Sequence, residues 1–513
     1  MAATNGDSTS GDSTNVTDGG SSNGGSTNAS TSGGGGRPSF ETLREAAAAA
    51  NRLIGAAVDA AALAGAGSQY SETLAREFDY VTPENATKWG PLAPSSSSYD
   101  WQGADAIVDF AEAHEQTVKG HTFVWHEQTP SWVSTSMSAG ELNAALKSHI
   151  ETTLARYQGR MRAWDVVNEA VDVNTASGYR ESVFYQVLGP GYIADAFRWA
   201  RAADPDVLLF YNEIGAERLG AKSDFMYAMI QELLASGVPI DGIGLQSHVS
   251  THRYPAESDL RANIRRFADL GLRVNISEVD ARTKNVPGSQ EARWLMERIA
   301  FQQVVGSCVV EPGCEAITFW GVTDNYSWIN EEGEEDPLLF DRSYMRKPAY
   351  EGALDGFLGL LPVRGANLVA NSDFAGGATG WEATAGELTV AAAEGGTGNA
   401  ACITGRSDVG DGLLQADLLE ALQSGGPLAF SAMVRVDAAS SVEAALLIVE
   451  GGEEREFNIA SRAIAADQWL ELSGYLGLGF EQAPSAISLK LYGPASGVGL
   501  CATAVQLRPL TVE

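Results

Sequence analysis

The chain has 513 residues, more than one compact core usually holds, so two or three folding units are expected. Its formal net charge of −32 and isoelectric point near 4.5 argue against nucleic acids and anionic membranes as partners, because both would repel it. Of its 34 basic residues only these are lysine: Lys88, Lys119, Lys147, Lys222, Lys284, Lys347 and Lys490. An acidic, lysine-poor composition predicts a halophilic protein in which salt screens self-repulsion, and an acidic mesophilic protein is the alternative.

The N-terminal segment, residues 1–38, consists almost entirely of Gly, Ser, Thr, Asn and Asp. Such a composition buries too little apolar area to offset the entropy of ordering, so we expect a disordered tail. The first residues lack the basic and apolar character of a signal peptide. No apolar run in the chain approaches the roughly 18 residues that span a bilayer, so no membrane partner is expected.

From residue 39 to 359, short apolar runs alternate with amphipathic stretches. We predict eight strands at 54–58, 78–81, 118–125, 163–168, 207–211, 240–246, 273–277 and 316–320. Helical patterns are found at 104–114, 141–156, 192–203, 222–235, 257–270 and 291–305. Repeated β-then-α units over about 320 residues fit an α/β fold, a closed (β/α)8 TIM barrel, better than an open sheet.

A different pattern begins after a short linker at residues 360–366. From 367 to 513 helical periodicity largely disappears, and Gly-punctuated alternating runs such as 428–436 and 487–492 replace it. This pattern predicts a smaller all-β jelly-roll sandwich.

Four cysteines are too few for a disulfide scaffold. Cys308 and Cys314 are close enough in sequence to bridge a short loop, and Cys402 and Cys501 are candidates for a second pair. Free buried thiols are the alternative.

Polar and aromatic side chains follow most of the predicted barrel strands where each strand ends, which in a TIM barrel is the face that forms the active site. In chain order they are Glu84, Asn85, Lys88, His121, Trp125, Gln128, Asn168, Glu169, Glu213, Gln246, His248, Glu278, Asp280 and Trp320. Each one alone also fits a core or a solvated position, but their coincidence at successive strand ends favours a catalytic site. A metal site is the rival interpretation, yet no His-x-x-x-His or Cys-x-x-Cys spacing supports it.

The motifs Trp164-Asp-Val-Val-Asn-Glu169, Val274-Asn-Ile-Ser-Glu-Val-Asp280 and Phe319-Trp-Gly-Val-Thr-Asp-Asn-Tyr-Ser-Trp328 resemble glycoside hydrolase family 10. Thr82-Pro-Glu-Asn85 and Gly120-His-Thr-Phe-Val-Trp-His126 add to the resemblance, which runs from about Phe40 to Phe357. It implies a retaining endo-1,4-β-xylanase that acts by double displacement through a covalent glycosyl-enzyme and needs no catalytic cofactor or metal.

By this resemblance Glu278 is the nucleophile and Glu169 the acid/base. A retaining mechanism requires the two carboxyl groups to lie about 5 to 5.5 Å apart. We expect the negative charge of Glu278 to raise the pKa of Glu169, so that Glu169 is protonated for the first step.

Supporting roles follow from the matched positions. Asn168 is expected to bond the sugar 2-hydroxyl, His248 to orient Glu278 with Asp280 behind it, and Gln246 to lie near Glu169. The expected substrate-binding residues are Glu84, Asn85, Lys88, His121, Trp125 and Gln128, with Trp320 and Trp328 as a roof over the sugar. Glu213 has no catalytic role in the family pattern and is interpreted as structural.

The C-terminal region resembles carbohydrate-binding modules of families 4, 9 and 22 through Asn367 to Trp381, Ile403 to Arg406 and Trp469 to Gly474. Trp381 and Trp469 match framework positions, which leaves Arg406 and Tyr492 as candidate sugar contacts. Residues 407–412 and 500–504 depart from the family pattern, so a purely stabilising role is the alternative. A structural calcium ion in this module has no supporting motif.

The implied partners are xylan and xylo-oligosaccharides, with no nucleic acid and no membrane. We expect a monomer, and a polymeric substrate implies an extracellular location although no signal peptide is visible. The alternatives are a β-1,4-glucanase or dual xylanase and cellulase, and a non-catalytic glycan-binding protein on a decayed barrel.

Overall fold

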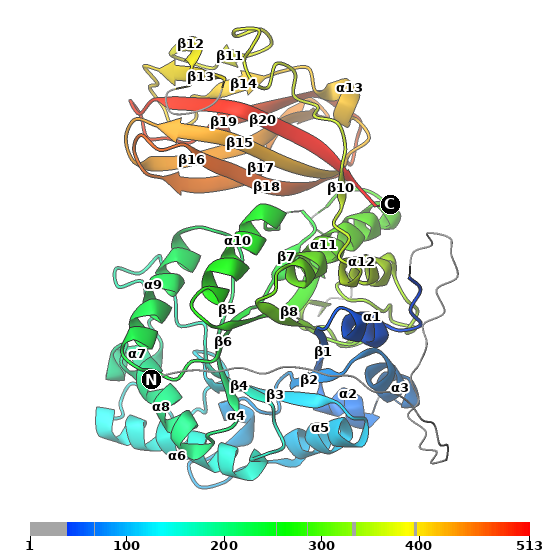
Figure 1. Cartoon of the computed structure of the whole chain (residues 1–513), viewed down its shortest axis with the longest axis vertical. Helices are drawn as coiled ribbons and strands as arrows, with labels where there is room; N and C mark the ends of the chain where they lie inside the picture. Colours follow the sequence, from blue (N-terminus) through cyan, green and yellow to red (C-terminus); the bar gives the residue numbers. More distant parts are fainter. Residues whose placement is uncertain are drawn as a thin grey trace, which may run out of the picture. The chain divides into compact units, whose positions relative to one another are not determined.

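The computed structural model describes residues 38–512, apart from 66, 253, 285, 331–334 and 394–397. The predicted disordered tail therefore lies almost entirely outside the described residues. Two regions of regular structure follow one another along the chain, a mixed α/β region and an all-β region (Figure 1). Among the described residues no helix combines the length and the apolar character needed to cross a membrane.

The first region is a closed barrel of eight parallel strands, and all eight lie where the sequence predicts them. They are β1 (Leu53–Val58), β2 (Tyr80–Pro83), β3 (Thr117–Val124), β4 (Ala163–Asn168), β5 (Leu208–Glu213), β6 (Gly242–Leu245), β8 (Arg273–Arg282) and β9 (Cys314–Phe319). The pairing of β1 with β9 and of β6 with β8 closes the ring. The short strand β7 (His248–Ser250) pairs with the end of β8.

Helices connect these strands around the barrel (Figure 1). They are α1 (Leu43–Ala49), α2 (Ala60–Gly65), α3 (Ser68–Glu77), α4 (Trp89–Leu92), α5 (Gln102–Ala113), α6 (Ala139–Tyr157), α7 (Val183–Leu188), α8 (Tyr192–Ala203), α9 (Ala221–Ala235), α10 (Glu257–Ala268), α11 (Gln290–Val310) and α12 (Pro348–Phe357). Two 3₁₀ turns, η1 (Asp324–Tyr326) and η2 (Trp328–Asn330), lie in the loop after β9. The six predicted helices all form, and the shorter ones were not predicted.

Local sequence signals explain these elements. Strand β4 is buried along its whole length, as expected for a parallel strand covered by helices on one side and by the barrel interior on the other. Helix α6 begins with a capping box in which the Ser138 hydroxyl accepts from the Glu141 amide and the Glu141 carboxylate accepts from the Ser138 amide. Gly120 on β3 is required for packing, because a Cβ there would lie 2.2 Å from the ring of the buried Trp164.

The second region consists of two antiparallel sheets. Its strands are β10 (Val363–Arg364), β11 (Glu382–Ala383), β12 (Glu387–Ala392), β13 (Asn399–Thr404), β14 (Leu413–Gln415), β15 (Gly426–Val436), β16 (Ser440–Glu450), β17 (Glu453–Ile464), β18 (Leu470–Leu478), β19 (Pro484–Tyr492) and β20 (Leu500–Thr511), with one helical turn, α13 (Leu419–Leu422). One sheet has the order β12-β13-β20-β15-β18 with β10 beside β20, and the other β11-β14-β19-β16-β17. Alternating burial along β15 shows the two-residue period that the sequence predicts for a half-buried strand.

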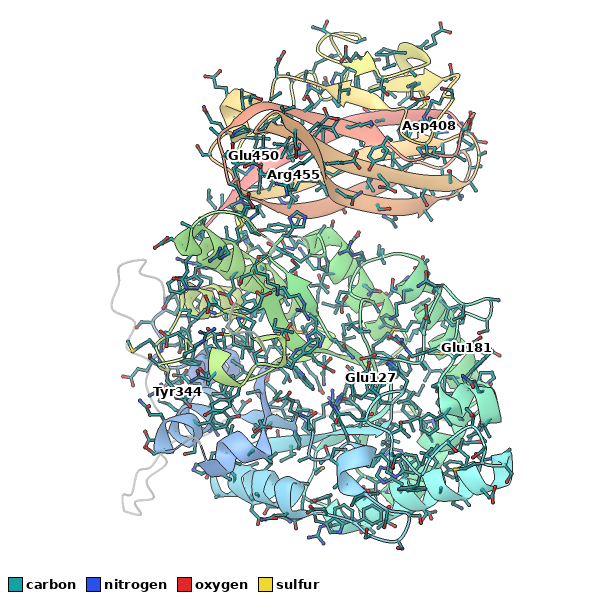
Figure 2. The ribbon with its side chains drawn as sticks, turned by 180° about the vertical axis from the view of Figure 1, so that it is seen from behind. Glu127, Glu181, Tyr344, Asp408, Glu450 and Arg455 are labelled. Atoms are coloured by element: carbon teal, nitrogen blue, oxygen red, sulfur yellow. A yellow bond between two sulfur atoms is a disulfide. The ribbon has the colours of Figure 1, made fainter. Side chains whose placement is uncertain are left out.

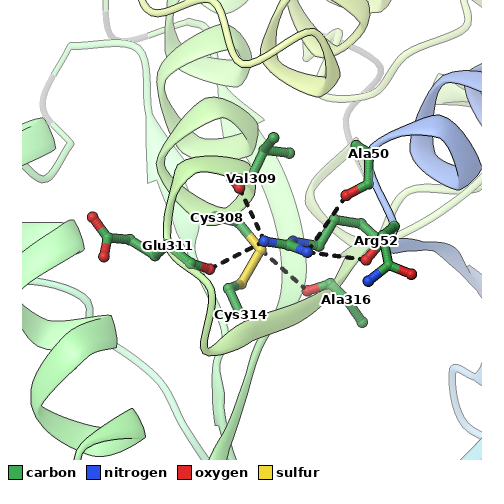
Figure 3. Close-up of a disulfide and its surroundings, with 8 residues drawn as sticks. Ala50, Arg52, Cys308, Val309, Glu311, Cys314 and Ala316 are labelled. Atoms are coloured by element: carbon green, nitrogen blue, oxygen red, sulfur yellow. Dashed lines mark hydrogen bonds between the residues drawn. A yellow bond between two sulfur atoms is a disulfide. The ribbon is translucent and has the colours of Figure 1, made fainter. Parts of the chain in front are cut away.

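Both expected disulfides are present, Cys308 with Cys314 and Cys402 with Cys501. The first joins the end of α11 to the start of β9 (Figure 3). Beside it the Arg52 guanidinium donates to the carbonyls of Val309 and Glu311. The bridge and the arginine together secure the loop between α11 and β9 to the barrel.

Replacing Cys402 and Cys501 with Ser should destabilise the protein more than replacing Cys308 and Cys314. The Cys402–Cys501 bridge joins residues 99 apart and the Cys308–Cys314 bridge residues 6 apart, and the entropy that a cross-link removes from the unfolded chain grows with loop length. The expected loss in the free energy of unfolding is about 4–5 kcal/mol for the long loop and under about 3 kcal/mol for the short one. Chemical denaturation of both double variants measures this, and equal losses would contradict the loop-length argument.

Candidate active site

The two predicted catalytic carboxylates lie on strands of the same barrel face, Glu278 within β8 and Glu169 directly after β4. Both are buried, with 4% of Glu278 and 8% of Glu169 exposed. The polar residues that the sequence places at other strand ends surround them. The barrel therefore gathers side chains that are up to about 240 residues apart in the chain, as Glu84 and Trp328 illustrate.

The carboxylate of Glu278 is held on both oxygens. Asn212 Nδ2 donates to Oε1 at 2.6 Å, and His248 Nε2 lies 3.1 Å from Oε2. On its other side His248 Nδ1 lies 2.9 Å from Asp280 Oδ1, so the imidazole bridges two carboxylates. The expected pairing of His248 with Glu278, with Asp280 behind, is observed.

The charge of His248 follows from this arrangement. Burial alone would lower its pKa, but the carboxylates of Asp280 and Glu278 outweigh burial and raise the pKa to about 10. His248 is therefore an imidazolium at neutral pH. Its positive charge lies 3.1 Å from the Glu278 carboxylate.

The His248 charge should make stability depend on pH in a defined direction. The folded-state pKa of His248, about 10, exceeds the ordinary value of 6.5. The contribution of protonated His248 to the free energy of unfolding is therefore complete below about pH 6.5 and is lost as pH rises toward 10. The free-energy difference between the wild type and His248→Asn should shrink by up to about 1.4 kcal/mol per pH unit over that range. Urea titrations at several pH values measure it. A difference that grows with pH would contradict a protonated His248.

The carboxylate of Glu169 has a different environment. Gln246 Nε2 donates to its Oε1 at 3.0 Å, and Asn168 Nδ2 lies 3.4 Å from the same atom. Its Oε2 lies 3.8 Å from His126 Nδ1 and 3.9 Å from Arg180 Nη2. Figure 2 labels Glu127, which follows His126 in the chain and lies 3.5 Å from its ring.

The expectation of a raised pKa for Glu169 is wrong for this geometry. Burial does raise it, but the Gln246 hydrogen bond and the charges of His126 and Arg180 outweigh burial, so the pKa of Glu169 lies below its ordinary value of 4.5. The sequence argument considered only the charge of Glu278. The donors that reverse the shift come from other strands and loops, so they are not visible beside Glu169 in the chain.

A chain of amides connects the two carboxylates. Asn212 Nδ2 lies 2.6 Å from Glu278 Oε1 and 2.9 Å from Asn168 Oδ1. Gln246 Nε2 lies 3.2 Å from the same Asn168 oxygen and 3.0 Å from Glu169 Oε1. Ser277 orients Asn212 by donating to its Oδ1 at 2.6 Å. The amides fix the separation of the two carboxylates without adding charge.

The predicted substrate-binding residues form two groups. Asn85 Oδ1 accepts from both Lys88 and Gln128 at 3.0 Å, and the Lys88 ammonium lies over the Trp125 ring, 4.6 Å from its centre. Burial raises the pKa of the neighbouring Glu84 to about 7 against the opposing charge of Lys88. Asn85, Lys88, Gln128 and Trp125 therefore lie together in one cluster, and their contact with a sugar stays a prediction.

The second group consists of aromatic rings that pack against His121 and His248. Trp320 is buried and packs edge-on against His121 and His248 at 5.2 and 6.2 Å between ring centres. Trp328 is 41% exposed, lies 5.1 Å from the His248 ring, and donates from its indole to Asp280 at 2.7 Å. An indole anchored at its nitrogen can offer a face to a sugar, and the role of Trp328 in a roof over the substrate stays a prediction.

Sequence reasoning gave no role to four residues of this site, namely Asn212, His126, Arg180 and Asp165. Asn212 is the next-to-last residue of β5, and its position near a strand end was the available signal. Asp165 lies 3.0 Å from His121 and 2.7 Å from Lys119, and its burial inside β4 resembles a core position. Arg180 had no local signal because it belongs to a loop after β4. Among the described residues no group of three or more His, Cys, Asp or Glu is placed to hold a metal ion.

In the all-β region Arg406 is buried, and every N–H of its guanidinium donates within the chain. The acceptors are carbonyls of Asp408, Val409, Asp411, Ala495 and Val498. Asp408 is labelled in Figure 2. With no free donor for a sugar, Arg406 holds two loops together, which departs from the expected sugar contact.

The other candidates of this region divide as follows. Tyr492 is half-buried, and its hydroxyl donates to carboxylates of Glu443 and Glu456. Trp381 is buried in the core of the two sheets, as predicted for a framework residue. Trp469 is half-buried. Tyr492 therefore remains as the candidate contact.

Comparison with known proteins gives the family of the chain. The model of glycosyl hydrolase family 10 matches residues 42–356, more than half of the chain. Endo-1,4-beta-xylanase B of Thermotoga neapolitana is 40% identical over 287 residues, which cover 55% of this chain and 81% of that protein.

Solved structures give the same result. Xylanase 10B of Thermotoga maritima is 41% identical with a TM-score of 0.58, over 62% of this chain and 98% of that one. Xylanase 10B of Thermotoga petrophila, solved with xylobiose, is 39% identical with a TM-score of 0.59, over 63% of this chain and 99% of that one. The chain belongs to glycosyl hydrolase family 10, a family of retaining, double-displacement hydrolases.

Proposed function

We propose that the chain is an endo-1,4-β-xylanase that cleaves internal linkages of xylan with Glu278 as nucleophile and Glu169 as acid/base. The observation that carries the assignment of roles is the different environment of the two carboxylates. Glu278 is bonded by an imidazolium and an amide, whereas Glu169 has amides near one oxygen and His126 and Arg180 within 4 Å of the other.

In the first step Glu278 Oε attacks the anomeric carbon of the xylose as the bond to the leaving oxygen breaks. Glu169 transfers its proton to that oxygen, so the leaving sugar departs as a neutral alcohol. We assign to Asn168, whose amide nitrogen lies 3.4 Å from Glu169 Oε1, the hydrogen bond to the 2-hydroxyl of the sugar under attack. In the second step Glu169 removes a proton from water as the water attacks the same carbon, and Glu278 leaves as a carboxylate.

The lowered pKa of Glu169 has a consequence for this sequence of events. Before substrate binds, Glu169 is ionised near neutral pH and must gain a proton to act as an acid. Glycosylation of Glu278 removes the charge of the nucleophile, which favours the ionised form of Glu169 that then acts as base. We expect activity with xylan to be greatest on the acidic side of neutrality.

The stereochemical test uses xylo-oligosaccharides in water with proton NMR of the first product. Two displacements at one carbon give a β-product first, which then equilibrates with the α-anomer. An initial α-product would contradict retention. Parallel assays on xylan and carboxymethylcellulose decide the backbone, since equal rates on both would replace the proposal with a dual enzyme.

We propose that the all-β region binds polysaccharide and so keeps the enzyme on an insoluble substrate. The support is its two antiparallel sheets and the half-buried Tyr492 on β19. Retention of the full chain with inactivated Glu278 on insoluble xylan, compared with a Tyr492→Ala form, tests it. Equal retention of the two forms would remove Tyr492 as a contact.

We further propose that the enzyme acts outside the cell, because its polymeric substrate cannot enter, and that it is adapted to high salt. The support for the second proposal is the net charge of −32 with only 34 basic residues. The extracellular location is tested by assaying the culture medium of the native host for the protein.

Lowering salt should destabilise the protein. At 1 M salt the screening length is about 3 Å and at 0.1 M about 10 Å, so repulsion among the excess carboxylates grows as salt is removed. The thermal midpoint should fall by at least several degrees between these concentrations. Sucrose at matched osmolarity is the control, because it does not screen charge. A midpoint unchanged by salt would contradict halophilic adaptation.

A further inference from the structure

Three side chains form a buried cluster against the residues that follow Glu169. Tyr211 and Glu213 belong to β5 and are fully buried, and Lys222 lies in the first turn of α9 with 21% of its side chain exposed. Glu213 Oε1 lies 2.9 Å from Lys222 Nζ, and the Tyr211 hydroxyl donates to Glu213 Oε2 at 2.5 Å. The cluster thus contains a carboxylate whose charge is balanced by an adjacent ammonium.

The cluster binds the backbone next to the acid/base. The Ala170 amide donates to the Tyr211 hydroxyl at 3.1 Å, and the Val171 amide donates to Glu213 Oε2 at 3.1 Å. The first two backbone amides after Glu169 therefore both donate hydrogen bonds to this cluster. Tyr211 accepts from Ala170 while it donates to Glu213, so one hydroxyl joins the backbone to the ion pair.

Glu169 needs such support because its backbone is left-handed, with φ of +55°. A residue with a side chain adopts this region only where its surroundings impose it. The other backbone groups of Glu169 are also held, since its amide donates to the Asn212 carbonyl at 2.9 Å and its carbonyl accepts from Arg180 Nε at 2.8 Å. The direction of the Glu169 carboxyl thus depends on contacts from β5, the loop after β4 and α9.

Glu213 itself has no atom available for substrate. Its Oε2 accepts from Tyr211 and Val171, and its Oε1 accepts from Lys222 and from the Ile214 amide at 3.2 Å. It is completely buried, and this burial raises its pKa against the opposing effect of Lys222. It therefore acts only through its neighbours, although it ends a strand as a catalytic carboxylate would.

We propose that Tyr211, Glu213 and Lys222 are positioning residues that hold the backbone after Glu169, and so aim its carboxyl at the leaving oxygen. The proposal rests on the assignment of Glu169 as acid/base. Small errors in the placement of a reacting group reduce rates steeply, by as much as about 10²-fold for a displacement of about 1 Å. Removing a member of the cluster should therefore weaken proton transfer to the leaving group more than any other step.

The experiment measures kcat/KM on two xylose-based substrates that differ in their leaving group. Xylopentaose has a leaving group that must be protonated, and 2,4-dinitrophenyl β-xylobioside has one that departs without a proton. For Glu213→Gln we expect a loss of about 10²-fold on xylopentaose and of less than about threefold on the dinitrophenyl substrate. Tyr211→Phe is a milder change, so we expect a loss of kcat/KM of about tenfold on xylopentaose and again a smaller loss on the dinitrophenyl substrate.

Lys222 supplies a further pair of variants. Lys222→Met should reproduce the selectivity of Glu213→Gln, and Lys222→Arg, which keeps the charge, should retain most of the wild-type rate on xylopentaose.

Glu311→Gln is the matched control. Glu311 is likewise a buried carboxylate in an ion pair, 2.6 Å from Arg261 and from Arg265, but it precedes β9 at the opposite end of the strands. Its loss should lower thermal stability and leave the ratio of the two kcat/KM values unchanged.

Equal losses on both substrates in Glu213→Gln and Tyr211→Phe would overturn the proposal, because a merely structural role does not distinguish leaving groups. If Glu169→Ala itself showed no such selectivity, the assignment of the acid/base would fail instead. The two failures are therefore distinguishable.

Discussion

Glu278→Ala should lower kcat on xylan by at least about 10⁴-fold, because the first displacement then has no nucleophile. Glu278 lies 2.6 Å from Asn212 and 3.1 Å from His248, so the substitution leaves a small space bounded by an amide and an imidazolium. That space suits a small anion. Azide should therefore restore turnover of 2,4-dinitrophenyl β-xylobioside by attacking from the face that Glu278 occupied.

The stereochemistry of the rescued product identifies the role. A single displacement by azide on the Glu278 side inverts the anomeric carbon and yields the α-glycosyl azide, which proton NMR distinguishes from the β-form. Thermal midpoints of the variant and the wild type show whether the fold is intact. A β-azide from this variant would contradict Glu278 as the nucleophile.

Glu169→Ala should lower kcat/KM on xylopentaose by about 10²- to 10⁴-fold, the usual contribution of a general acid. On the dinitrophenyl substrate kcat/KM should change little, because that leaving group needs no proton. The glycosyl-enzyme should then accumulate, since no base activates water for the second step. A burst of dinitrophenol followed by slow turnover measures this directly.

Azide again separates the roles. In Glu169→Ala it attacks the glycosyl-enzyme from the face where water normally enters, so the product is the β-glycosyl azide with net retention. Gln246→Ala is a useful companion, because its amide donates to Glu169 at 3.0 Å but transfers no proton. It should lower the rate without azide rescue. An α-glycosyl azide from Glu169→Ala would instead indicate that Glu169 is the nucleophile and Glu278 the acid/base.

Much of the fold could be predicted because its signals are local. Four of the six residues of β4 are apolar, the exceptions being Asp165 and the terminal Asn168, and such an apolar run is typical of a strand buried on both faces. The shorter helices escaped prediction. Helix α4, Trp89–Leu92, contains Gly90 and Pro91, which disfavour a helix by themselves, and it forms because the barrel holds it.

The sequence by itself determined the order of strands, the pair Glu169 and Glu278, and the neighbours Asn168 and His248, because motif and strand-end position identify them without coordinates. Only the tertiary structure decided the ionisation of Glu169, since His126, Arg180 and Gln246 approach it from separate elements. It likewise decided that Arg406 and Glu213 are fully engaged within the chain. The hydrogen-bond partners and the burial of these side chains depend on residues distant in the chain. Partners and burial together set the charge of each side chain and whether it is available to a substrate.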